Sequence, residues 1–85
     1  MSAANKRVEV KAPMAGVFYR SAGPDEPVYV EVGDTVKKKQ ILALLETMKV
    51  FQKVKSPAAG TVVEITVENE TPVMDDDVML VVEKS

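Results

Sequence analysis

Short apolar runs separated by turn-forming residues follow one another along the chain. The runs are rich in Val, Ile, Leu, Tyr and Phe, and no window shows apolar residues recurring every three or four positions over ten or more residues, as an amphipathic helix requires. Such spacing is typical of a small β-sandwich or barrel. The pattern therefore predicts an all-β domain, with strands in VEVKAP, GVFYR, VYVEVG, QILALLE, VFQKVKSP, GTVVEITV and VMLVVE.

The chain also contains an internal repeat. Three pairs of segments match, namely residues 12–17 with 56–61, 30–36 with 65–73, and 36–46 with 73–83. Neither half could close a hydrophobic core alone. The repeat therefore predicts a flattened β-barrel with pseudo-two-fold symmetry, a barrel-sandwich hybrid of two four-stranded antiparallel sheets. Because Gly16, Gly33 and Gly60 are isolated and no helix is expected after them, we interpret them as turn or bulge residues with positive φ.

The two halves differ by an insertion. Nine more residues separate Gly16 from Val30 than separate Gly60 from Ile65, and the excess centres on the segment SAGPDEP. The symmetry also maps the hairpin tip at residues 46–50 onto the end of the chain, after Glu83. We therefore expect the hairpin at one end of the barrel and both termini near the opposite end.

Composition narrows the possible functions. The chain has 85 residues, a net charge of −2 and a pI near 5.1, and it contains no Cys and no His. These values predict one small domain, residues 8–85, after a flexible lead-in, residues 1–7. They argue against nucleic-acid binding, disulfides, thiolate metal sites and histidine chemistry. No apolar stretch is long enough to span a membrane and no signal core is present, so we expect a cytoplasmic protein without a membrane partner.

The stretch LLETMKVFQ, residues 44–52, breaks the local rules for a tight hairpin. Thr47, Met48 and Lys49 stand at the turn, where Gly, Pro, Asn or Asp is usual. A lysine amine in water has a pKa of about 10.4, so it is a poor catalytic base. It is a good handle for another enzyme to acylate. The sequence therefore singles out Lys49 as the candidate functional residue.

Two charged turns occupy equivalent places in the halves. Lys37-Lys38-Lys39 is interpreted as a solvated turn. The equivalent Asp75-Asp76-Asp77 lacks the glycine-containing loop and distal glutamate of a calcium site, so no metal is expected there.

The segment ETMKV, midway between the two Pro-x-x-Gly half repeats, resembles the attachment hairpin of biotinyl domains. The resemblance covers the chain from about Val8 to Glu83. It implies that biotin is attached covalently to Lys49. The rest of the attachment hairpin would then be Glu46, Thr47, Met48 and Val50.

The segment GVFYR…GPDEP resembles the thumb of the biotin carboxyl carrier proteins of bacterial and plastid acetyl-CoA carboxylase. In that family the thumb folds toward the biotin. The resemblance therefore places thumb residues at Ser21, Ala22, Gly23, Pro24, Asp25, Glu26 and Pro27.

The resemblance implies a non-catalytic carrier. A biotin protein ligase would attach the biotin, a biotin carboxylase would carboxylate it, and a carboxyltransferase would pass the carboxyl group to an acceptor, by resemblance an acyl-CoA. Two alternatives stay open. Lipoyl carrier domains of 2-oxo acid dehydrogenases share the hairpin but usually have Asp before the lysine and Ala after it. Unmodified barrel-sandwich modules carry a helical hairpin insertion, which the apolar pattern does not predict here.

Overall fold

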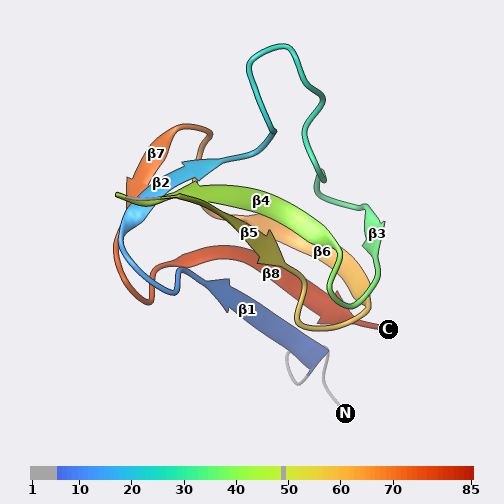
Figure 1. Cartoon of the computed structure of the whole chain (residues 1–85). Coiled ribbons are helices and arrows are strands. Elements are labelled where there is room, and N and C mark those ends of the chain that lie inside the picture. The colour runs from blue at the N-terminus through green and yellow to red at the C-terminus, as the bar shows by residue number, and fades with distance from the viewer. Residues whose placement is uncertain (1–5, 49) are drawn as a thin grey trace.

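A computed structural model of the protein describes residues 6–48 and 50–85. The described residues form two four-stranded sheets, ordered β1-β8-β6-β3 and β5-β4-β2-β7, in which all pairings are antiparallel (Figure 1). The strands are β1 (Arg7–Lys11), β2 (Gly16–Tyr19), β3 (Thr35–Val36), β4 (Ile41–Glu46), β5 (Phe51–Lys55), β6 (Gly60–Ile65), β7 (Thr71–Val73) and β8 (Val78–Lys84). The predicted all-β architecture is confirmed.

The strand order confirms the predicted two-fold. Exchanging β1 to β4 for β5 to β8 converts the order of one sheet into the order of the other. Hydrogen bonds repeat as well. The amide of Ala12 donates to the carbonyl of Asp77, and the equivalent amide of Ser56 donates to the carbonyl of Gln40, each at 2.8 Å. Each half therefore supplies strands to both sheets, which is why neither half could form the core alone.

The core lies between the sheets and is built mainly from the central strands. In both β4 and β8, four consecutive residues are buried. Burying each large apolar side chain is worth about 1.5–3 kcal/mol, so these strands dominate the stability of the barrel. The largest fully buried side chains are Phe18, Val36, Leu42, Leu45, Val62, Met79, Leu80 and Val82.

The prediction of a strand in VYVEVG is wrong. Val28 makes only an isolated bridge, to Ser21, and the next strand is the short β3. A tight turn interrupts the run, because the amide of Asp34 donates to the carbonyl of Glu31 at 3.0 Å and the Asp34 carboxylate accepts from the amide of Glu31 at 2.9 Å. Alternating apolar residues therefore did not produce a ladder here.

The interpretation of the glycines is correct for Gly33, which has φ 100°, and wrong for Gly16 and Gly60. Gly16 and Gly60 lie in strands at points of close approach. A Cβ on Gly16 would lie 2.6 Å from the carbonyl oxygen of Glu46, and one on Gly60 would lie 1.9 Å from that of Glu83. These positions require glycine because a neighbouring strand leaves no room for a side chain.

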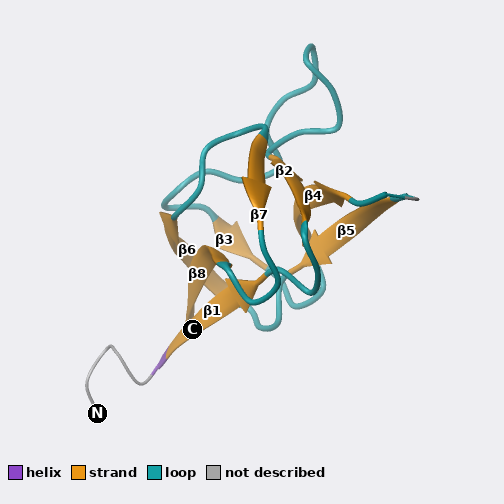
Figure 2. Ribbon diagram, turned by 90° about the vertical axis from the view of Figure 1, so that its left-hand side faces the viewer, coloured by secondary structure: helices purple, strands orange, loops and turns teal. Residues whose placement is uncertain are grey.

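The two ends of the barrel differ as predicted. Arg7 pairs with Glu83, so the beginning of β1 and the end of β8 lie together. Figures 1 and 2 show the β4–β5 hairpin pointing away from this end. Residues 1–5 of the predicted lead-in lie outside the described residues, and Arg7 already belongs to β1. Within the described part of the chain, no helix is long and apolar enough to cross a membrane.

Candidate functional site

The predicted attachment hairpin is formed by β4 and β5. Glu46 pairs with Phe51 at the end of the ladder. Beyond this pair, the amide and the side-chain hydroxyl of Thr47 both donate to the carbonyl oxygen of Val50, each at 3.0 Å. The threonine hydroxyl thus does what turn residues usually do, by bonding the local backbone. This closes the turn without Gly, Pro, Asn or Asp.

The described residues on either side of position 49 are apolar and exposed. Met48 is 103% exposed and Val50 is 57% exposed. Lys49, the predicted attachment residue, lies outside the described residues. Apolar side chains gathered at an exposed tip favour contact with other molecules. The described neighbours of position 49 are therefore accessible from solvent.

A groove of about 460 Å³ runs beside the tip. Its lining residues are Met14, Ala15, Thr47, Met48, Val50 and Gln52. The Gln52 amide donates to the Met14 sulfur at 3.7 Å. Met14 comes from the loop between β1 and β2, so this side of the hairpin is joined to the body of the barrel.

The opposite side of the hairpin is braced by Tyr19. Its hydroxyl donates to the Glu46 carboxylate at 2.9 Å, and its ring packs tilted against Phe51, with 6.0 Å between centroids. The hydrogen bond to Glu46 raises the pKa of the Tyr19 hydroxyl, and partial burial and the charges of Glu46 and Glu70 act in the same direction. Tyr19 thus contacts both strands of the hairpin. The sequence analysis missed this brace because Tyr19 and Glu46 are 27 residues apart.

The predicted thumb is a loop that leaves the barrel after β2 (Figure 1). Inside it, the Ser21 hydroxyl donates to the carbonyl of Gly23 at 2.8 Å, and the amide of Glu26 donates to the same carbonyl at 3.1 Å. A groove of about 280 Å³ lies between the thumb and the hairpin brace. Its lining residues are Tyr19, Ser21, Ala22, Gly23, Pro24, Phe51, Asn69 and Glu70. The fold therefore brings the first half of the thumb, but not Asp25, Glu26 or Pro27, to the groove beside the hairpin.

The aspartate turn, residues 75–77, uses a carboxylate to bind its own backbone. The Asp77 carboxylate accepts from the amide of Met74 at 2.8 Å. Among the residues that the structure describes, no group of three or more His, Cys, Asp or Glu side chains could hold a metal ion.

The chain matches known proteins along nearly its whole length. Residues 8–82 match the family model described as biotin-requiring enzyme. A relative from Arabidopsis thaliana, named biotin carboxyl carrier protein of acetyl-CoA carboxylase 1, chloroplastic, is 47% identical over 87% of this chain. A relative from Pseudomonas aeruginosa, named biotin carboxyl carrier protein of acetyl-CoA carboxylase, is 45% identical over 79% of this chain. The chain spans 26% of the Arabidopsis protein and 43% of the Pseudomonas protein.

Solved structures show the same fold at low sequence identity. A single-chain, multi-domain long-chain acyl-CoA carboxylase matches with a TM-score of 0.79 and 21% identity, over 94% of this chain and 7% of that one. The urea carboxylase of Kluyveromyces lactis matches with a TM-score of 0.74 and 22% identity, over 89% of this chain and 6% of that one. Each match covers a small part of a much larger protein.

Proposed function

Because the chain belongs to the family of biotin-requiring enzymes, we propose that it is a biotin carboxyl carrier domain with biotin joined to the Lys49 amine. The observation that carries this proposal is the hairpin tip. Met48 and Val50, on either side of position 49, stand in solvent at the end of a turn closed by two hydrogen bonds. A modifying enzyme can approach such a tip without unfolding the barrel.

The residues of the tip suit a covalently attached biotin. The bound group would supply the carboxyl-accepting ring, while the chain supplies attachment, orientation and reach. The brace formed by Tyr19, Glu46 and Phe51 supports the base of the hairpin, and Met48, beside position 49, is fully exposed. Attachment at a supported, exposed hairpin would let one tethered group visit two active sites at high effective concentration.

The proposed partners follow from this role. A biotin protein ligase would form the amide bond at Lys49. A biotin carboxylase and a carboxyltransferase would then load and unload the arm, with an acyl-CoA as the acceptor. The Arabidopsis and Pseudomonas relatives, both named as carriers of acetyl-CoA carboxylase, support this assignment. The domain itself would carry no catalytic residue.

Biotinylation can be tested directly. Co-expression with a biotin protein ligase is expected to give a streptavidin shift and a mass gain of about 226 Da in the parent chain. Lys49→Arg should abolish both, because the guanidinium is not acylated. Lys53→Arg is the matched control, since Lys53 is an exposed lysine of β5 in the same hairpin, and it should label like the parent.

Two outcomes would contradict the proposal. One is labelling that persists in Lys49→Arg. The other is a mass gain of about 188 Da from cells that supply both cofactors, which would identify a lipoyl carrier instead.

A further inference from the structure

Arg20 joins the thumb to the barrel. It follows directly after β2, and its carbonyl accepts from the amide of Tyr29 at 2.8 Å, on the returning arm of the loop. Its guanidinium Nη2 donates to the carbonyl of Val30 at 3.0 Å. Its own amide donates to the Asn69 side chain at 2.8 Å. One residue therefore holds the loop where it leaves the barrel and where it returns.

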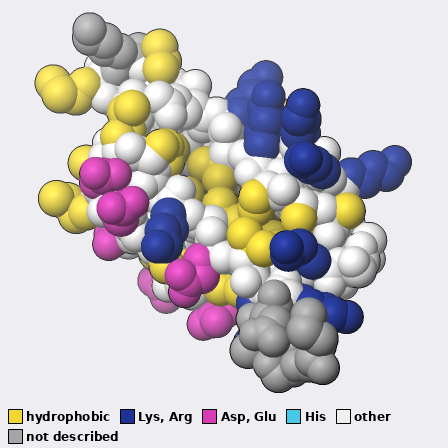
Figure 3. Space-filling view, turned by 90° about the horizontal axis from the view of Figure 1, so that it is seen from below, with side chains coloured by type: hydrophobic (Ala, Val, Ile, Leu, Met, Phe, Trp, Pro, Cys, Tyr) yellow, Lys and Arg dark blue, Asp and Glu magenta, His cyan; other side chains and the backbone are white. Residues whose placement is uncertain are grey.

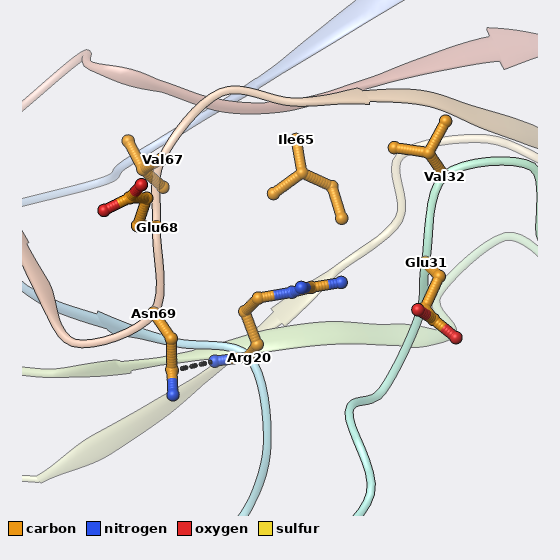
Figure 4. Close-up of a pocket in the computed structure, with 7 residues that line it drawn as sticks. All are labelled: Arg20, Glu31, Val32, Ile65, Val67, Glu68 and Asn69. Carbon is orange, nitrogen blue, oxygen red and sulfur yellow. Dashed lines mark hydrogen bonds between the residues drawn. The ribbon is translucent and has the colours of Figure 1, made fainter.

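The Arg20 side chain is partly buried. It lies across a groove of about 500 Å³ whose apolar wall is formed by Val32, Ile65 and Val67 (Figure 4). The Nε atom is buried and has no hydrogen-bond partner among the described residues. Glu31 and Glu68 also line this groove. A planar guanidinium with a buried Nε has little freedom to change direction, so it is a stiff connection.

The other hydrogen bonds of the loop are internal to it. Ser21 bridges to Val28, and the remaining bonds within the thumb converge on the carbonyl of Gly23. Among the described residues, every hydrogen bond between residues 21–30 and the rest of the barrel involves Arg20. Val30 adds a buried side chain at the point of return. The direction of the thumb is thus set at its base.

Asn69 connects this base to the functional side of the molecule. Its side chain accepts the amide of Arg20, and it lines both the Arg20 groove and the groove between thumb and hairpin. The second half of the chain has no counterpart to this arrangement. The residue equivalent to Arg20 is Glu64, which is exposed and lies within β6, and no inserted loop follows it.

We propose that Arg20 is the positioning residue of the thumb, holding it over the Tyr19–Phe51 side of the attachment hairpin. The consequence for carboxyl transfer rests on the proposed carrier function, while the structural role does not. Loss of the guanidinium frees the carbonyl of Val30 and lets the loop swing, so the groove beside the hairpin is formed for only part of the time.

Hydrogen exchange tests the structural role without biotin. In Arg20→Ala, the Tyr29 amide is expected to exchange about tenfold faster, the effect of losing one partly buried charge-assisted hydrogen bond. The Val62 amide, which donates to Asp34 in the barrel, serves as the internal reference and should keep its rate. Arg20→Lys should give an intermediate rate, because an ammonium can reach one carbonyl but lacks the planar fork. Unchanged exchange at Tyr29, or acceleration only in step with Val62, would overturn the proposal.

Kinetics of the biotinylated chain test the functional role. Arg20→Ala should raise KM for carboxylation by a biotin carboxylase about threefold or more with little change in kcat, since fewer molecules present the thumb in its docking position. Deletion of residues 21–27 sets the upper limit of this effect, and Arg20→Lys should restore part of the loss. Labelling by the ligase, which needs the hairpin, should stay within about twofold of the parent. A normal KM in Arg20→Ala, with rapid exchange at Tyr29, would refute the functional part. Absence of any biotinylation would refute the carrier function and leave the exchange result standing.

Discussion

The two halves of the barrel build the same turn with opposite charges. In the lysine turn, residue Lys39 has φ 73°, and in the aspartate turn Asp76 has φ 70°. A side chain accepts a backbone amide in each turn: the Gln40 side chain accepts from the amide of Lys37 at 3.0 Å, and the Asp77 carboxylate accepts from the amide of Met74 at 2.8 Å. Figure 3 shows basic and acidic side chains gathered on different sides of one face of the molecule. The comparison teaches that backbone conformation and an acceptor specify this turn, whereas its charge is free to vary.

The halves diverge where the function is proposed. Glu46 and Glu83 occupy equivalent positions in β4 and β8, yet Glu46 accepts a hydrogen bond from Tyr19, whereas Glu83 forms a partly exposed ion pair with Arg7 at 3.6 Å. An exposed pair of this kind contributes little to stability. The Tyr19 brace and the exposed residues Met48 and Val50 of the tip that it supports belong to the first half.

The largest effect on stability is expected at Gly60 and Gly16, the equivalent glycines of the two halves. Gly60→Ala should lower the free energy of unfolding by about 3 kcal/mol or more, because its Cβ would lie 1.9 Å from a backbone oxygen. Gly16→Ala, with its closest contact at 2.6 Å, should cost less, about 2 kcal/mol. Urea denaturation measures both changes. Gly23→Ala is the control, since its nearest atom is 3.8 Å away, and it should stay within about 0.5 kcal/mol of the parent. A larger loss at Gly16 than at Gly60 would contradict this ranking.

A smaller effect on stability is expected from substitutions in the equivalent turns at Gly33 and Glu70. Both residues have positive φ, and their amides donate to the equivalent carbonyls of Val62 and Phe18. Gly33→Ala should destabilise the domain by about 1–2 kcal/mol, because a side chain is strained at φ 100°. Glu70→Gly removes similar strain but adds entropy to the unfolded chain, so its net effect should be within about 0.5 kcal/mol of zero. Thermal and urea unfolding measure the stability of both variants. A loss of stability in Glu70→Gly as large as that in Gly33→Ala would contradict the prediction.

The smallest effect concerns the brace that only the first half contains. Because the pKa of the Tyr19 hydroxyl is raised in the folded state, its contribution to stability is complete below pH of about 10 and is lost as the pH rises through the folded pKa. The difference in unfolding free energy between the parent and Tyr19→Phe should therefore be constant at neutral pH and shrink at alkaline pH. Tyr29→Phe is the matched control. A difference that grows above pH of about 10 would contradict the hydrogen bond to Glu46.

Local patterns predicted much of the fold and part of the site. The alternation of apolar runs and turns identified β1, β2, β4, β5, β6 and β8 but not the short β3 and β7. The repeat predicted the equivalence of the sheets and the opposite placement of hairpin and termini. The run VYVEVG failed because the Glu31–Asp34 turn outcompeted its β-pattern. The hairpin tip was recognised from its unusual turn residues, but the closure by Thr47 was not, since a threonine hydroxyl at that position has no distinctive sequence signal.

The sequence by itself determined the all-β class, the symmetry, the inserted loop and the choice of Lys49 as the candidate residue, because each depends on the order and spacing of residues along the chain. Only the tertiary structure decided that Tyr19 braces Glu46 and Phe51, that Gly16 and Gly60 face neighbouring carbonyls, and that Arg20 holds the thumb between Val30 and Asn69. These contacts join residues that are distant in sequence. They depend on how the two sheets close over the core, which no local pattern encodes.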